Sequence, residues 1–497
     1  MVKSYAEKQI ENFYERTLHN KMASENFSDF EVKTLSLPKV KLLTMFRLGL
    51  YQMGLGMMSI LTLGVLNRVM IDELKVPAVI AAFAIAMHQV VSPARVWFGQ
   101  ISDTKPLFGH YRTGYVWLGT VGFALISFLA VQVVWQVGFS LQGGSWTVQT
   151  YGWVGLLALI FGLYGIALSA SSTPFAALLV DVSDEDNRSK IVGVVWSMLM
   201  VGIIVGAIIS SGLLRQIALD APLEVLQAQI NRLFLIVPAL VVGLCVAGTV
   251  GIEKKYSRFL ENNSFTNNNR EDKITLGEAL KVLTASRQTG IFFSFLLIMS
   301  LSLFMQDPVL EPFGGEVFKM TIAETTKLNA FFGTGTLIGL ALTGFLIAPR
   351  LGKQKTTKVG CIAVAICQAF IIAAGFSANP KLLQLSLVLF GFASGVTTTG
   401  ALSLMLDLTA AQTAGTFIGA WGLAQTLARA LATVSGGALL NIGKAVFTVP
   451  TFAYGLVFAV EALGMMIAVL LLSQVNVREF QQDAKTVIGS ILESELD

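Results

Sequence analysis

One short run of residues combines acidic and amide side chains with residues that interrupt helices. Residues 306–316 have the sequence Gln-Asp-Pro-Val-Leu-Glu-Pro-Phe-Gly-Gly-Glu. Proline and glycine break a helix and free backbone groups, so carboxylates here can point into a cavity or toward a partner. A solvated helix end is the structural alternative. The candidate contact residues are Gln306, Asp307, Glu311, Pro312, Gly314, Gly315 and Glu316.

A second group of residues has the types expected of a cap or a latch: Gly99, Asp103, Gly109 and Arg112. Glycine permits close contact between helices. Asp103 can accept hydrogen bonds at a helix N-terminus or pair with a basic residue such as Arg112. A latch that holds one conformation and a purely structural cap both fit this pattern.

Four charged residues lie inside long apolar runs: Arg47, Arg95, Arg429 and Glu461. A charge in hydrocarbon costs a few kcal/mol, so each needs a partner or water and is a functional candidate. We expect Arg429 and Glu461 to pair across adjacent helices.

Composition indicates which elements position these residues. The chain of 497 residues is 54% hydrophobic and 13% charged, whereas soluble proteins carry about 25% charged residues. Apolar runs of about 18 residues or more recur, each long enough to cross a bilayer core of roughly 30 Å, and in lipid such runs must be helical. We predict an all-α polytopic membrane protein whose twelve transmembrane helices lie at 43–67, 77–99, 114–137, 152–174, 190–214, 232–252, 288–306, 328–349, 357–377, 381–406, 412–440 and 452–474.

The distribution of Lys and Arg predicts orientation and domains. These residues are about three times as frequent in one set of alternate loops as in the other, which predicts that both termini are cytoplasmic. The tail at 1–41 is either an amphipathic surface helix or a partly unstructured segment. The predicted units are this tail, a six-helix bundle at 42–252, a cytoplasmic linker at 253–287, a second six-helix bundle at 288–476 and a cytoplasmic tail at 477–497.

The two predicted bundles repeat a pattern at equivalent junctions. An aspartate, a glycine and a tryptophan recur with the same aspartate-to-glycine spacing, as Asp181, Gly193 and Trp196 and as Asp407, Gly419 and Trp421. Correspondence between halves is typical of duplicated transporter folds. The Gly99–Arg112 loop resembles the signature loop of the major facilitator superfamily, which implies a fold of two six-helix halves.

Two longer stretches resemble one branch of that superfamily. Residues 92–118, SPARVWFGQISDTKPLFGHYRTGYVWL, and residues 304–320, FMQDPVLEPFGGEVFKM, are similar to the PucC/LhaA family, also called the bacteriochlorophyll-delivery family. The similarity extends from about Lys41 to the twelfth predicted span. It implies a multi-pass protein of the thylakoid or photosynthetic inner membrane that helps to assemble chlorophyll-binding light-harvesting or photosystem proteins.

The resemblance also implies that the chain handles chlorophyll or bacteriochlorophyll. His88 and Gln89 are the candidate ligands, because an imidazole can ligate the magnesium of a chlorophyll and a glutamine can do so more weakly. A hydrogen-bonded core histidine is the alternative. In this interpretation residues 306–316 are a contact site for a pigment-protein partner.

Three functions fit these patterns. The preferred one is a non-enzymatic assembly factor that binds chlorophyll-protein intermediates within the bilayer; the others are a secondary transporter of a small solute and a permanent photosystem subunit. No nucleotide-binding loop or catalytic triad is visible, and the three cysteines lack metal-ligand spacing. A net charge of +4 is too small to imply a nucleic-acid partner. We therefore expect no enzyme activity, no metal and no nucleic acid.

Overall fold

The computed structural model describes residues 40–141, 146–183, 188–215, 221–257, 287–408 and 414–476. The predicted N-terminal helix, most of the predicted linker and the C-terminal tail lie outside these residues.

The first half of the chain is a bundle of long helices that follow the apolar runs. Pro93 and the turn before it divide one of the predicted spans into two helices, α3 and α4. The elements of this half are α2 (Leu42–Ser59), the π-helical segments η1 (Ile60–Leu66) and η2 (Val69–Glu73), α3 (Ala78–Val90), α4 (Ala94–Thr104), α5 (Thr113–Leu141), α6 (Val148–Asp181), α7 (Arg188–Leu214), α8 (Leu223–Thr249) and α9 (Ile252–Tyr256).

The second half is built in the same way, with one short helix inserted after its first long one. Its elements are α12 (Arg287–Phe304), α13 (Leu310–Phe318), α14 (Ile322–Leu342), the π-helical segment η3 (Thr343–Ile347), α15 (Ala348–Leu351), α16 (Lys353–Ser377), α17 (Pro380–Leu408), α18 (Ala414–Val446) and α19 (Pro450–Gln474).

The helices confirm the predicted all-α membrane fold. Each of the twelve predicted spans coincides with a helical segment of the described chain. Within the described residues, 8 helices are long and apolar enough to cross a membrane, and two shorter apolar helices are Ala78–Val90 and Gly290–Phe304. Several helices run beyond the predicted bounds, as α6 does at both ends.

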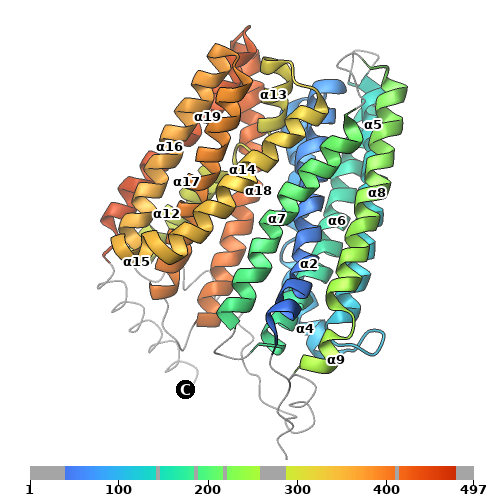
Figure 1. The fold of residues 1–497 in the computed structure, drawn as a ribbon. Coiled ribbons are helices and arrows are strands. Elements are labelled where there is room, and N and C mark those ends of the chain that lie inside the picture. The colour runs from blue at the N-terminus through green and yellow to red at the C-terminus, as the bar shows by residue number, and fades with distance from the viewer. Residues whose placement is uncertain are drawn as a thin grey trace, which may run out of the picture.

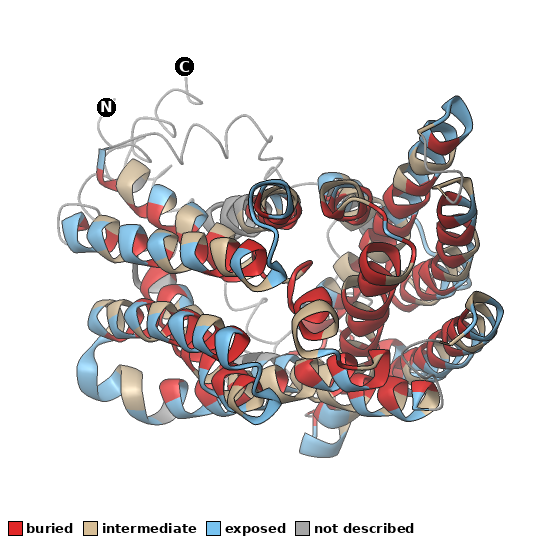
Figure 2. Cartoon of the chain, turned by 90° about the horizontal axis from the view of Figure 1, so that it is seen from above, coloured by how far each residue is buried: buried red, intermediate tan, exposed pale blue. Residues whose placement is uncertain are grey.

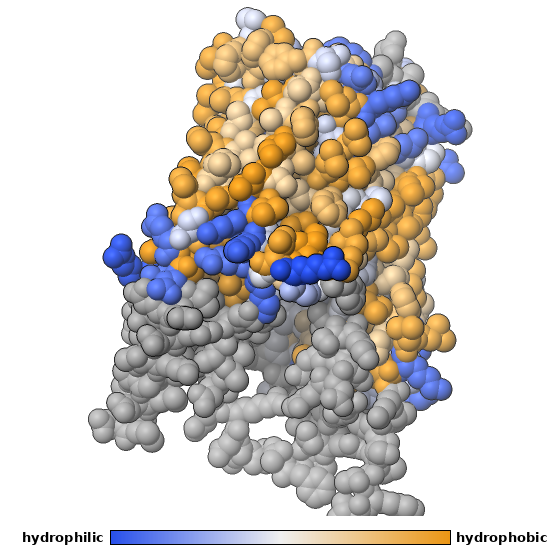
Figure 3. Space-filling view, turned by 60° about the vertical axis from the view of Figure 1, so that its left-hand side comes forward, coloured by the Kyte–Doolittle hydropathy of each residue, from blue (hydrophilic) through white to orange (hydrophobic). Residues whose placement is uncertain are grey.

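The two halves meet along two seams. Helix α7 packs against α14, and α3 packs against α18. Within the first half, α5 packs on α6. Within the second half, α14 and α16 both pack on α17. Viewed along the bundle, buried residues line the helix faces that are turned toward one another (Figure 2). The core is therefore made by interhelical contact, while the outer face carries exposed apolar side chains over much of its height (Figure 3).

The bundle has two distinct ends. We call one the tail end, because the described chain begins and ends there at Val40 and Asn476; it also carries α4, α9 and α15 (Figure 1). The opposite end carries α13 and the loop that precedes it (Figure 1).

Candidate functional site

The predicted contact run, residues 306–316, forms a compact turn and a short helix between α12 and α14. The chain leaves α12 after Phe304, passes through Pro308 and enters α13 at Leu310. Lys319 ends α13 with a left-handed φ of 57°. Thr321 and Glu324 then form a reciprocal capping box that starts α14. The segment is therefore positioned by a helix stop on one side and a helix cap on the other.

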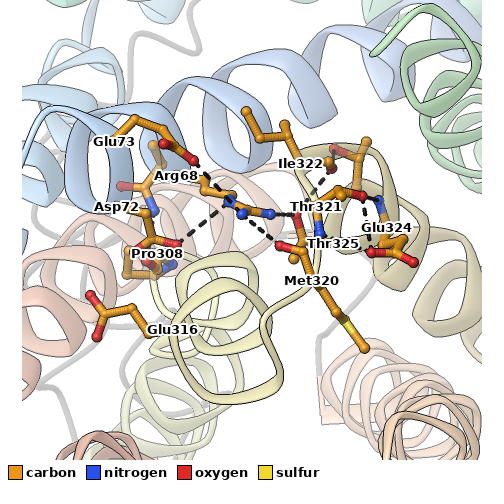
Figure 4. A network of polar contacts seen from close by, with 12 residues as sticks. Arg68, Asp72, Glu73, Pro308, Glu316, Met320, Thr321, Ile322, Glu324 and Thr325 are labelled. Carbon is orange, nitrogen blue, oxygen red and sulfur yellow. Dashed lines mark hydrogen bonds and ion pairs between the residues drawn. The ribbon is translucent and has the colours of Figure 1, made fainter. Parts of the chain in front are cut away.

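Arg68 of the first half is the centre of a polar network that reaches this segment (Figure 4). Its guanidinium is 2% exposed and donates hydrogen bonds to the Thr325 hydroxyl and, at 2.8 Å, to the Met320 carbonyl. Its Nε lies 3.5 Å from the Asp72 carboxylate, and Nη2 lies 3.8 Å from Glu73. A buried cation of the first half is thus held by the backbone and a hydroxyl of the second.

Amide side chains extend the same network. Asn67 Nδ2 donates to the Pro308 carbonyl at 2.6 Å, and Asn329 Nδ2 donates to Glu311 Oε1 at 2.5 Å. Glu311 is 2% exposed and faces the backbone of Gly64, where a Cβ atom would collide with Oε1. Because Gly64 belongs to η1, the carboxylate of the second half is seated directly against the first half.

The two adjacent glycines are explained by close approach. A Cβ on Gly315 would collide with the Asp72 carboxylate and lie 2.9 Å from Arg68 Nη2. A Cβ on Gly314 would lie 2.7 Å from Thr325 Cγ2. The pair therefore allows α13 to rest on the Arg68 network, rather than supplying flexibility.

The remaining predicted contact residues are also engaged within the chain. Gln306 and Pro312 are buried. Glu316 pairs with Lys444, and Asp307 lies 3.4 Å from Arg429; both cations belong to α18. The sequence favoured carboxylates that face a cavity or a partner, whereas the carboxylates in the structure face side chains and backbone of the same chain. We name the residues Asn67, Arg68, Asp72, Glu311, Glu316, Thr325, Asn329 and Lys444 the junction cluster.

The pairing expected for Arg429 and Glu461 is wrong. Arg429 instead pairs with Asp307 and lies over the Phe304 ring, 4.0 Å from its centroid. Glu461 is fully buried and accepts a hydrogen bond from Gln368 of α16, while its Oε1 has no hydrogen-bond partner in the described chain. Residues on adjacent helices pair only when both side chains point into the same space, and sequence spacing does not report that direction.

The other two intramembrane arginines have different surroundings. Arg47 donates to the carbonyls of Ala247 and Val250 at 2.7 and 2.6 Å, so it caps the C-terminus of α8. Arg95 is exposed at the start of α4, and no ion pair or hydrogen bond joins its side chain to another described residue.

At the tail end, the predicted loop is held by residues outside it. Arg112 Nε lies 2.9 Å from Asp181, and its Nη1 donates to Ser102 at 2.8 Å. The Glu253 carboxylate, 2% exposed, accepts from the backbone N–H groups of Tyr111, Arg112 and Thr113 at 2.7 to 3.3 Å. Glu253 therefore caps the start of α5.

Asp103 lies in the last turn of α4 rather than in the first turn of a helix, and its role as a cap or as an ion-pair partner stays a prediction. Arg112 forms an ion pair with Asp181. Gly109 has a φ of +71°, which favours glycine in the turn between α4 and α5. Gly99 lies within α4, where a Cβ would make ordinary contact with Thr173 of α6 at 3.6 Å.

His88 and Gln89 lie in the last turn of α3 and differ in exposure. His88 Nδ1 is bonded to the Ile85 carbonyl, so Nδ1 carries the proton and Nε2 of the neutral ring keeps its lone pair. The ring is half-buried and meets Tyr164 edge-on at 6.0 Å. Gln89 is 6% exposed, and its Oε1 has no hydrogen-bond partner in the described chain.

Several important residues were missed by sequence reasoning. Arg68 lies just beyond the predicted span 43–67, although its spacing of four from Asp72 is that of an ion pair on a helix. Glu253 was counted only as the start of the linker. Asn67, Asn329 and Lys444 have no signal in the sequence that distinguishes them from other polar residues near helix ends. Among the described residues, no group of three or more His, Cys, Asp or Glu side chains could hold a metal ion.

Comparison with known proteins gives one family. The model of the family described as "PUCC protein" matches residues 65–480. The chain is 31% identical over 443 residues to the "Bacteriochlorophyll synthase 44.5 kDa chain" of Rhodobacter capsulatus, covering 86% of this chain and 94% of that relative. It is 29% identical over 438 residues to "Protein PucC" of Cereibacter sphaeroides, covering 86% and 90% respectively.

Comparison with solved structures gives the fold. The nucleoside transporter NupG superposes with a TM-score of 0.63 at 12% identity, covering 87% of this chain and 99% of that one. A bacterial homologue of the iron transporter ferroportin, in an inward-facing state, superposes with a TM-score of 0.62 at 12% identity, covering 89% and 99%. The chain therefore has the fold of major facilitator transporters, as the signature loop predicted.

Proposed function

The chain belongs to the PucC protein family, and from this premise we propose that it is an assembly factor of the photosynthetic membrane. Its clients would be chlorophyll-binding light-harvesting or photosystem proteins, which it would bind laterally in the bilayer, with both of its own termini on the cytoplasmic side.

One observation carries this proposal: the similarity to PucC proteins spans both halves. It includes residues 304–320, which form the link between α12 and α14. The relatives carry the names PucC and bacteriochlorophyll synthase chain. The outer face of the bundle supports lateral binding, because large apolar side chains are exposed on it (Figure 3). One relative is named a synthase, but we propose a non-enzymatic role.

The junction cluster changes how residues 306–316 would contribute. Glu311 and Gln306 are buried and cannot touch a client while the chain is in this conformation. We therefore expect substitutions here to weaken client binding by loosening the two halves, with Asp307 and Glu316 as the partly exposed members of the run.

A chlorophyll or bacteriochlorophyll would be held by His88. The hydrogen bond from Nδ1 to Ile85 fixes the ring and leaves Nε2 as the nitrogen able to ligate magnesium. Gln89 fits less well as a ligand, because it is buried beside the end of α3. The bound pigment would supply light absorption; the protein supplies the ligand and its orientation.

The test is purification of the full chain from its photosynthetic host in mild detergent. We expect chlorophyll-binding proteins to co-purify, and pigment absorbance to fall in the variant His88→Leu. His110→Leu is the matched control, because His110 is the histidine of the tail-end turn. A preparation with neither pigment nor a chlorophyll-binding protein would contradict the proposal.

A second candidate function, transport of a small solute, is favoured by one observation. Hydrogen bonds between the halves gather at the opposite end, joining Asn67, Arg68 and Ala78 to the second half. Alternating access requires contacts between the halves that can form and break at one end of the bundle, and hydrogen bonds are contacts of this kind. Solute uptake by reconstituted vesicles that is lost in Arg68→Gln, with no chlorophyll-protein bound, would replace the assembly role with transport.

A further inference from the structure

A group of basic residues lies at the tail end of the second half, where α15 meets α16 (Figure 1). Arg350 belongs to α15, and Gly352, with a φ of +80°, separates this short helix from α16. Lys355 and Lys358 lie in the first two turns of α16. Arg350 and Lys355 are exposed, and Lys358 is half-buried. We name Arg350, Lys355 and Lys358 the basic cluster.

The positive charge of the basic cluster is not balanced by carboxylates of the described residues. None of them forms an ion pair with Arg350, Lys355 or Lys358, and residues 325–406 contain no Asp or Glu. Cations in the first turns of a helix also oppose the helix dipole, whose N-terminal end is positive. The cluster therefore does not stabilise α16 electrostatically, and its charges are available to an anion from outside the chain.

The equivalent place in the first half is neutralised by the chain itself. There the short helix α4 leads into α5, as α15 leads into α16. Arg112, just before α5, forms an ion pair with Asp181 at 2.9 Å, and Glu253 accepts hydrogen bonds from the backbone at the start of α5. No side chain caps the start of α16. The first half thus supplies carboxylates at this place, whereas the described part of the second half supplies none to the basic cluster.

An exposed apolar stripe continues from the basic cluster along α16. Its residues follow Lys355 and Lys358 at helical spacings of three and four, so they lie on the same face of the helix. The stripe consists of Val359, Ile362, Ile366 and Phe370, which are 39% to 53% exposed. Figure 3 shows hydrophilic residues at the tail-end edge of the described chain, below a largely apolar surface. The face of α16 therefore presents cations at the tail end and hydrocarbon-compatible side chains next to them.

We propose that the basic cluster binds the headgroup of an anionic phospholipid in the leaflet at the tail end, with the acyl chains of the lipid against the α16 stripe. The phosphate oxygens of such a lipid accept hydrogen bonds from a guanidinium and from ammonium groups. Basic residues beside a membrane span attract anionic lipids in this way. A soluble anion would match the cations but not the stripe, whereas a phospholipid matches both. The site goes beyond the proposed function and does not depend on it.

The test uses the purified full chain in a neutral maltoside detergent with three probes. These are phosphatidylglycerol and the uncharged-overall phosphatidylcholine, each in mixed micelles, and inorganic phosphate. Native mass spectrometry counts the bound lipid, and thermal unfolding is recorded along each titration. We expect saturable binding of phosphatidylglycerol in preference to phosphatidylcholine, weakened about fivefold for each cation removed in Arg350→Gln, Lys355→Gln and Lys358→Gln. Binding should also weaken as the salt concentration is raised.

The control is the triple variant Lys105→Gln, Lys254→Gln and Lys255→Gln. It removes three exposed lysines near the tail end of the first half, so it matches the net charge of the triple variant of the basic cluster. Unchanged binding in the control and loss in the cluster variant support the site.

Three outcomes overturn the proposal. The first is equal binding of the two lipids, and the second is equal loss in the two triple variants, since binding would then follow net charge. The third is saturation by inorganic phosphate that displaces phosphatidylglycerol completely, since the ligand would then be a soluble anion. If the triple cluster variant does not fold, Lys355→Gln decides, because Lys355 is exposed. None of these measurements involves pigment or client protein, so failure here leaves the assembly role standing.

Discussion

At the scale of single residues, two buried charges, Arg68 and Glu253, have backbone groups among their partners. Arg68 lies near the carboxylates of Asp72 and Glu73 and donates hydrogen bonds to the Met320 carbonyl and the Thr325 hydroxyl. Glu253 accepts hydrogen bonds from three backbone N–H groups. Such arrangements are strong because the donors or acceptors are already fixed by helices and turns. They also make the stability of the fold sensitive to substitution of either partner, because a buried polar group that loses its hydrogen-bond partner cannot bind water instead.

The Glu253 cap gives a prediction at this scale. Replacing Glu253 with Gln should lower the free energy of unfolding by about 2 kcal/mol, because an amide turns one acceptor into a donor that opposes the N–H groups of α5. Thermal unfolding in detergent measures the loss. Glu224→Gln is the control and should have the smaller effect, because Glu224 is an exposed residue of α8. Equal losses in the two variants would contradict the cap.

At the scale of elements, interruptions of helices decide where the halves touch. The π-helical segments η1 and η2 flank Asn67 and Arg68, and both residues reach the second half. Helix α13 is a short insertion that fills the opposite end between η2 and α14. An uninterrupted transmembrane helix has no turn whose free backbone groups could accept hydrogen bonds from these side chains. The interrupted segments therefore connect the two halves.

Removing the central cation of the junction cluster tests this role. Arg68→Gln leaves Asp72 buried without its ion pair, and we expect a loss of about 3 kcal/mol in the free energy of unfolding. Cysteines placed in α13 should also react faster with an impermeant reagent. Arg215→Gln removes an exposed arginine at the same end and should change neither property. If the two variants matched, the junction cluster would not be what fastens the halves.

The seam between α14 and α17 gives a second prediction for elements. A Cβ on Gly391 would collide with the Phe332 carbonyl, and Thr336 N lies 2.9 Å from its position. Gly391→Ala should therefore push the helices apart and cost roughly 1–3 kcal/mol. Gly243→Ala in α8 places its Cβ in open space and is the control. Thermal unfolding of both variants decides, and an unchanged Gly391→Ala protein would show that the seam yields at little cost.

At the scale of the whole molecule, the chain has a transporter fold, and residues 304–320 lie where its halves join. Residues 304–320 connect α12 to α14 and carry the contacts to η1 and η2. The major facilitator architecture thus supplies two bundles, and the segment that contains α13 contacts the first bundle at one end.

The orientation of this molecule remains a prediction from the loop charges. A cysteine placed at Asn267 should be labelled from the cytoplasmic face of sealed membranes, and one placed at Ser377 from the opposite face. Background labelling is limited, because Cys245, Cys361 and Cys367 are all buried. Labelling of the Asn267 site from the outer face would reverse the proposed topology.

The sequence by itself determined the class and the spans of this protein. Apolar runs in a chain with 13% charged residues leave helices as the solution in lipid, and the motifs around Asp103 and Glu311 led to the family. The predicted helix ends differ from the observed ones, because α6 and other helices continue beyond the apolar run that hydropathy detects.

Only the tertiary structure decided which polar groups meet. Arg429 and Glu461 lie on adjacent helices and do not pair, whereas Arg68 and Thr325, far apart in the chain, do. The physical reason is direction: hydropathy and spacing give a residue's depth and helix, but rotation of each helix about its axis is set by packing against neighbours. The same packing brought Glu253 to the start of α5 and seated Glu311 against Gly64.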